Sequence, residues 1–144
     1  MLWVNQGDAP NAEPSSHHSR LPKMLATGVD LIEVDRIEEA VQRFGARFLD
    51  RVFTVAEQRD CADRPTSLAA RWAAKEAASK ALGIGIGDVR WVEMEVVRGV
   101  RGEPVLRFHG DAATLVAARG WRTWSLSLSH TAELAIAFVV AQGE

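Results

Sequence analysis

A charged segment at residues 71–83 holds the side chains best suited to phosphate chemistry. It reads Arg-Trp-Ala-Ala-Lys-Glu-Ala-Ala-Ser-Lys-Ala-Leu-Gly. In a helix, Glu76 and Lys80 share one row, and Arg71 and Lys75 form the neighbouring row, although Lys75 could equally face solvent. A carboxylate beside such cations suits a magnesium ion bound together with a phosphate ester. An ordinary surface ion pair, stabilising by only about 0.3–0.5 kcal/mol, is the alternative.

A second acidic motif, Gly28-x-Asp30, lies far upstream of this helix. The apolar run at residues 24–32 predicts a buried strand, and Asp30 interrupts it. An unpaired carboxylate in such a strand is strongly unfavourable, so we expect it to be neutralised, hydrogen-bonded or bound to a cation. Capping of the following helix is the alternative, but Glu33 and Asp35 lie closer to its first turn.

These two motifs resemble the holo-acyl-carrier-protein synthase family, the small bacterial 4′-phosphopantetheinyl transferases. The likeness runs from about Met24 to Ala141. In chain order the matching segments are Gly28-Val29-Asp30 with Arg36-Ile37, Arg47-Phe48 leading to Phe53-Thr54-Val55-Ala56-Glu57, Trp72 to Gly83, and Ser127-Leu128-Ser129-His130-Thr131. The resemblance implies the fold of this family.

The resemblance also implies a reaction. A serine of an apo-acyl carrier protein attacks coenzyme A, which gives the holo-carrier and adenosine 3′,5′-bisphosphate. The implied cofactor is Mg²⁺, with Asp30 and Glu76 as metal ligands. Glu76 is the expected proton acceptor, and Lys80 is expected to contact the phosphate and leaving group. Arg71, Lys80 and His130 are the candidate coenzyme-binding residues.

The implied partner is an acidic acyl carrier protein, and the implied assembly is a homotrimer with active sites between subunits. Arg36 and Arg43 are the candidate carrier-binding residues. They share a face with Arg47 and Arg51 of a helix predicted over residues 36–51, which Gly45 could break or kink. Such a face would speed the encounter with an acidic partner, and a simply solvated surface is the alternative.

The order of the elements predicts an α+β fold with a mostly antiparallel sheet packed against helices and one long central helix. Asp35 and Asp111 are predicted helix caps, and Thr54 and Glu57 have the spacing of a capping box. The predicted helices cover 36–51, 55–62, 67–82 and 112–119, and the predicted strands cover 24–32, 91–97, 104–108, 124–129 and 134–140. Glu103 stands where the family commonly has Lys or Arg.

Composition sets the remaining expectations. The polar, proline-punctuated residues 1–23 are expected to form a disordered tail before a single domain at 24–144. The net charge of -2 gives no reason to expect a nucleic-acid partner, and no stretch is long enough to span a membrane. A single cysteine, Cys61, fits a reducing cytoplasm. A magnesium-dependent phosphohydrolase and a non-catalytic carrier-binding subunit stay open as alternative functions.

Overall fold

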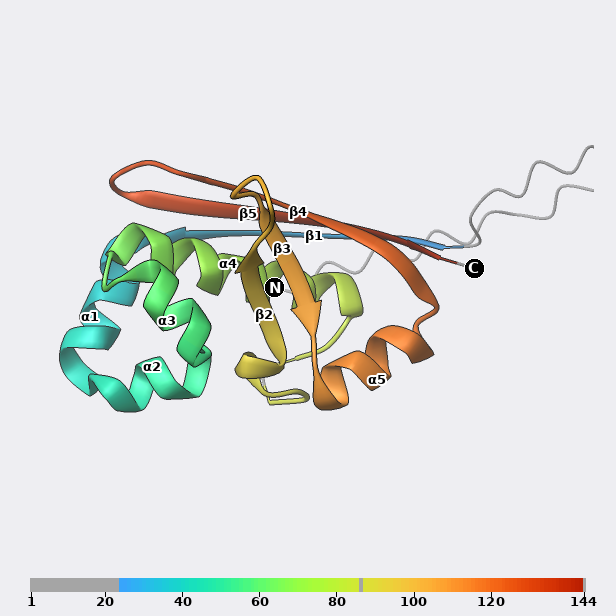
Figure 1. Cartoon of the computed structure of the whole chain (residues 1–144), viewed down its shortest axis with the longest axis horizontal. Helices are drawn as coiled ribbons and strands as arrows, with labels where there is room; N and C mark the ends of the chain where they lie inside the picture. Colours follow the sequence, from blue (N-terminus) through green and yellow to red (C-terminus); the bar gives the residue numbers. More distant parts are fainter. Residues whose placement is uncertain (1–23, 86, 144) are drawn as a thin grey trace, which may run out of the picture.

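A three-stranded antiparallel sheet runs the length of the molecule (Figure 1). The computed structural model describes residues 24–85 and 87–143, and the tail predicted at 1–23 lies outside them. The strands are β1 (Met24–Glu33), β5 (Leu134–Gly143) and β4 (Trp121–His130), hydrogen-bonded in the order β1-β5-β4. The predicted α+β class and antiparallel pairing are confirmed.

The long central helix α4 (Pro65–Leu82) packs along one face of this sheet. Proline at its first turn and Gly83, with a φ of 71°, mark its two ends. Many of the buried residues of α4 are alanines, which lets the helix backbone come close to the sheet. Those with no exposed surface are Ala69, Ala73, Ala74, Ala77 and Ala78.

Three short helices cover one end of the sheet (Figure 1). They are α1 (Val34–Phe44), α2 (Ala46–Val52) and α3 (Val55–Cys61). The single helix predicted over 36–51 is wrong, because Gly45 adopts a φ of 56° and separates α1 from α2. The predicted Asp35 cap is also wrong: Asp35 lies inside the first turn, and Glu33 is the N-cap residue without a side-chain capping bond.

A second, two-stranded sheet packs against α4 and β4. A 3₁₀ turn (Trp91–Glu93) leads into β2 (Met94–Arg98), which pairs antiparallel with β3 (Pro104–Phe108), and α5 (Gly110–Ala118) follows. The observed strand β2 therefore starts three residues after the start of the strand predicted over 91–97. The Asp111 cap is wrong, since α5 begins two residues earlier than predicted, with His109 at the N-cap and no side-chain capping bond.

The core forms where α4 meets the two sheets. Trp121 is buried there, and its ring and that of Trp124 both pack against Phe108. The indole nitrogen of Trp124 donates to the carbonyl oxygen of Leu106 at 2.7 Å, which ties β4 to β3. At the other end, the rings of Trp72 and Trp91 stack with centroids 4.4 Å apart.

The far face of the large sheet carries no helix of the described residues (Figure 1). The buried strand predicted at 24–32 is therefore wrong: side chains of β1 alternate, and Leu25, Val29 and Leu31 are exposed on this bare face. Ile136 and Phe138 of β5 join them. Among the described residues, no helix is both long and apolar enough for a membrane span.

Candidate active site

The predicted trio of Asp30, Glu76 and Lys80 lies together where β1 meets α4. The ammonium group of Lys80 donates to Asp30 Oδ1 at 3.0 Å and to the carbonyl oxygen of Val29 at 2.9 Å. Glu76 lies one helical turn before Lys80, and the charge of Asp30 acts on it. Residues 50 positions apart in the chain thus form one small charged cluster.

Glycine 28 explains how β1 delivers Asp30 to the helix. Gly28 and Asp30 point to the same side of the strand because side chains alternate. A Cβ built on Gly28 would overlap the carbonyl oxygen of Ala77 in α4. The Gly-x-Asp motif therefore combines a close backbone approach with a carboxylate two residues further along.

The electrostatics of the cluster favour an added cation. Burial raises the pKa of Glu76, the charge of Asp30 raises it further, and Lys80 lowers it in part. The two carboxylates repel each other, and one ammonium group does not cancel both charges. Although no group of three or more His, Cys, Asp or Glu side chains able to hold a metal occurs in the described residues, two carboxylates are a sufficient protein contribution for Mg²⁺ when substrate phosphates supply further oxygens.

Lys75 does not face solvent, contrary to one alternative from the sequence. Its side chain is fully buried, and its ammonium group donates to Glu57 Oε1 at 2.7 Å and to the carbonyl oxygens of Trp91 and Met94 at 3.0 and 2.7 Å. Burial lowers the pKa of Lys75, and Glu57 opposes this change. Lys75 therefore joins α4 to α3 and β2 and is closed to a phosphate.

The capping box at Thr54 and Glu57 is confirmed, and its carboxylate has a second use that the sequence analysis missed. Glu57 accepts from the Thr54 amide at 3.1 Å and also from the Val96 amide of β2 at 3.2 Å. A buried glutamate 18 residues before a helical lysine gives no periodic signal, so only the three-dimensional structure reveals this network.

Arg71 and His130 line a common cavity of 370 Å³ between α4, β4 and the β2–β3 hairpin. Arg71 is only 7% exposed, and its Nε atom is buried with no hydrogen-bond partner among the described residues. A buried, unpaired guanidinium donor is costly, and an anion in the cavity would satisfy it. The remaining lining residues are Ser67, Ala70, Val96, Val97, Arg98, Gly102, Pro104 and Leu128.

The two groups of predicted site residues do not meet within one chain. Arg71 and Glu76 are five residues apart, so their side chains leave α4 about 140° apart in direction. His130 pairs with Ala135 of β5, whose partner in β1 is Ile32. His130 therefore lies two strands, roughly 9–10 Å, from β1, and Asp30 lies two residues further along that strand. The cavity lining includes none of the Asp30 cluster.

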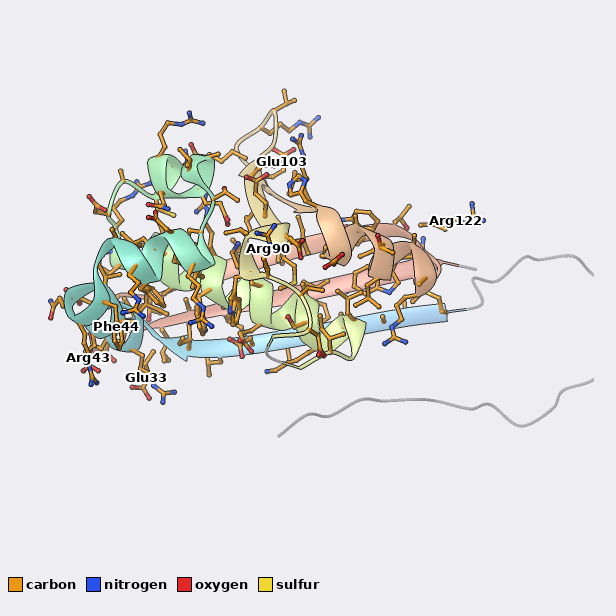
Figure 2. The ribbon with its side chains drawn as sticks, turned by 90° about the horizontal axis from the view of Figure 1, so that it is seen from below. Glu33, Arg43, Phe44, Arg90, Glu103 and Arg122 are labelled. Carbon is orange, nitrogen blue, oxygen red and sulfur yellow. The ribbon has the colours of Figure 1, made fainter. Side chains whose placement is uncertain are left out.

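The candidate carrier-binding arginines lie on α1. Arg36 and Arg43 are exposed and seven residues apart, so they share a helix face. The guanidinium of Arg43 lies 5.2 Å from the ring centroid of Phe44, and Figure 2 shows both residues at the same end of the molecule. Beside them is a groove of 280 Å³ on α1 and α2, lined by Phe44, Arg47, Phe48 and Arg51.

Comparison with known proteins gives the class first. Residues 26–139 match the family model of the 4′-phosphopantetheinyl transferase superfamily. A holo-[acyl-carrier-protein] synthase of Herpetosiphon aurantiacus is 54% identical over 127 residues, which cover 83% of this chain and 100% of that protein. The chain therefore belongs to the holo-[acyl-carrier-protein] synthase family and is a 4′-phosphopantetheinyl transferase.

Solved structures agree with this membership. The chain is similar to Helicobacter pylori holo-[acyl-carrier-protein] synthase in complex with coenzyme A, with a TM-score of 0.73 and 33% identity over 80% of this chain and 98% of the other. It is also similar to the Chronobacterium ammoniagenes complex with coenzyme A, with a TM-score of 0.76 and 29% identity over 85% and 99% of the two chains.

Proposed function

We propose that this transferase moves the 4′-phosphopantetheine group of coenzyme A to a serine hydroxyl of an apo-acyl carrier protein. The serine oxygen forms a bond to the phosphorus next to the pantetheine, and the bond to the second phosphate breaks, so adenosine 3′,5′-bisphosphate leaves. The observation that carries the proposal is the meeting of Asp30, Glu76 and Lys80 in a chain whose relatives are solved with coenzyme A.

Magnesium is the cofactor that fits the carboxylate pair. Asp30 and Glu76 would hold the ion, and their mutual repulsion is the strain that such an ion relieves. Bound there, Mg²⁺ supplies positive charge that offsets the anionic diphosphate. The pair leaves coordination positions for substrate oxygens and water, as expected for a Mg²⁺ site.

Lys80 and Glu76 have separate proposed roles. Lys80, a third exposed, is fixed by Asp30 and can reach a phosphate oxygen at the rim of the cluster. A unit charge about 4 Å from a phosphate contributes on the order of 4 kcal/mol at an effective dielectric constant of 20. Glu76 is the proposed acceptor of the serine proton, directly or through a bound water.

Arg71 and His130 are the proposed contacts for other phosphate oxygens of the coenzyme. The orphaned Nε atom of Arg71 supports this role. Because their cavity and the Asp30 cluster lie apart in one chain, we propose that a neighbouring copy brings its own cavity against the cluster. The active site is then shared between subunits.

The bare sheet face supports a homotrimer. Val29, Leu31, Ile136 and Phe138 are between 39% and 61% exposed on adjacent strands, and such a continuous apolar face is typical of a subunit interface. We expect Phe138→Lys to shift the assembly toward monomer in sedimentation experiments. Val55→Lys, a matched change at an exposed valine on α3, should leave the assembly unchanged.

The carrier would approach α1. Arg36 and Arg43 present positive charge there, and the apolar groove beside Phe44 can take a hydrophobic side chain of the partner. This predicts an association rate that falls with added salt. Because coenzyme A and its carrier acceptor are intracellular, we also propose a cytoplasmic location.

Intact-mass analysis of an apo-carrier tests the proposed function. With enzyme, coenzyme A and Mg²⁺, the carrier should gain the mass of one phosphopantetheine group, and a chelator should abolish the gain. Glu76→Gln should lose the activity, whereas Asp111→Asn, an exposed carboxylate on α5, should retain it. Release of adenosine 3′,5′-bisphosphate without a carrier would instead indicate a hydrolase, and full activity of Glu76→Gln would contradict the assigned roles.

A further inference from the structure

Glu103 is the last residue of the turn that joins β2 to β3 and directly precedes β3 (Figure 2). The Gly99 amide donates to the Glu103 carbonyl oxygen at 2.7 Å, and the Gly102 amide donates to the Gly99 carbonyl oxygen at 3.0 Å. The Glu103 carboxylate then accepts from the Arg101 amide at 2.7 Å. Both the backbone and the side chain of Glu103 therefore hold the turn closed through hydrogen bonds.

Gly99 provides the space for this carboxylate. A Cβ built on Gly99 would overlap the carboxylate of Glu103. The φ of Gly99 is not in the left-handed region, in contrast to that of Gly102 at 82°, so its backbone does not itself require glycine. Gly99 and Glu103 therefore fit together, because the Glu103 carboxylate fills the space that a side chain on Gly99 would take.

The same turn forms a wall of the Arg71 cavity. Gly102 and Pro104, the two neighbours of Glu103 in the chain, line the cavity, whereas Glu103 does not. Its carboxylate is held by the Arg101 amide on the turn itself. The position of this wall relative to Arg71 thus depends on how firmly the turn is closed.

We propose that Glu103 is a positioning residue for coenzyme binding: it locks the hairpin turn against Gly99 and thereby fixes the wall of the cavity. The inference rests on the proposed function of that cavity. It also accounts for an acidic residue beside a phosphate site, because the negative charge is directed to a backbone amide and not into the cavity.

Three variants separate the turn lock from a charge effect. Glu103→Gln keeps an oxygen acceptor for the Arg101 amide, so the KM for coenzyme A should stay within about twofold of the wild-type value. Glu103→Ala removes the acceptor, and the loss of one exposed hydrogen bond should raise that KM roughly three- to tenfold with kcat unchanged. Gly99→Ala should do the same, because its new Cβ displaces the carboxylate.

The double variant Gly99→Ala with Glu103→Ala should be no worse than Glu103→Ala alone, since both changes break one contact. Val100→Ala, at a fully exposed position of the same turn, is the matched control and should bind like the wild type. Calorimetric binding of adenosine 3′,5′-bisphosphate should follow the coenzyme KM in every variant, and the KM for the carrier should not change.

Two results would overturn the turn lock. One is tighter coenzyme binding in both Glu103→Gln and Glu103→Ala, which would make the residue a simple electrostatic repellent. The other is unchanged binding in Gly99→Ala. Failure of the proposed function looks different, since the wild-type protein would then bind neither coenzyme A nor the bisphosphate.

Discussion

Lys75→Met is expected to destabilise the fold by about 3–5 kcal/mol, because it leaves the Glu57 carboxylate buried and unpaired. Both side chains are fully buried. Methionine fills the space of the lysine stem, so the loss comes from charge and hydrogen bonds and not from a cavity. Glu57 keeps its amide donors from Thr54 and Val96, but the carbonyl oxygens that Lys75 satisfied on the 3₁₀ turn and β2 lose their donor.

This loss is a large fraction of the roughly 5–15 kcal/mol by which domains are usually stable. Urea unfolding followed by tryptophan fluorescence should show a lower midpoint at fixed protein concentration, which must be held constant if the chain assembles. Lys80→Met is the matched control on the same helix. Its ion pair with Asp30 is partly solvated and should contribute no more than about 1 kcal/mol.

A second variant separates charge burial from general damage. Glu57→Gln combined with Lys75→Met removes both charges, and Gln retains an acceptor for the Thr54 amide. The double variant should recover at least half of the lost stability, because no uncompensated charge remains. The reasoning is refuted if Lys75→Met lies within about 1 kcal/mol of the wild type, or if the double variant is as unstable as the sum of the two single variants.

Two further predictions concern the charged cluster. Gly28→Ala should destabilise the fold by about 1–3 kcal/mol or more and reduce transfer activity, because its new Cβ would push β1 away from the Ala77 carbonyl. Thermal unfolding measures the change in stability, and Gly85→Ala, where a Cβ has room, is the control. Folding raises the pKa of Glu76, so between the ordinary glutamate pKa and this raised pKa the native state binds more protons than the unfolded state. The contribution of Glu76 to stability is therefore complete at low pH and is lost as pH rises through the raised pKa. Stabilisation by Mg²⁺ should show the opposite trend and grow as Glu76 ionises. Asp30→Asn should move the midpoint of the Glu76 titration, followed by NMR, to lower pH, and an unmoved titration midpoint would contradict the coupling between the two carboxylates.

The sequence predicted the charged cluster because each part of it depends on local geometry. Helical spacing places Glu76 and Lys80 on one row, and strand alternation places Gly28 and Asp30 on one side. The structure brings these two sets together, while their roles in catalysis stay predictions. The cavity of Arg71 was not predictable as a cavity, since its walls come from α4, β4 and a hairpin that meet only in three dimensions.

Burial was the property hardest to read from the sequence. The apolar run of β1 predicted a buried strand, yet one of its faces is exposed in the single chain. Hydrophobicity reports that a surface avoids water, but it does not say whether the same chain or another copy covers it. In α4, alanines lie on several faces of the helix, so no apolar stripe indicated that Lys75 points inward while Lys80 points outward.

One helix thus controls both halves of the proposed active site. Its buried alanines set the distance to the sheet and to Gly28. The hydrogen bonds of Lys75 hold β2, and Glu76 lies close enough for Asp30 to act on it. A rotation of α4 would move Arg71 and Glu76 in opposite directions relative to their surroundings, since they leave the helix about 140° apart. We expect the buried Lys75–Glu57 pair to oppose this rotation, so a lysine that contacts no substrate should still influence how the phosphate-binding groups of the proposed shared site align.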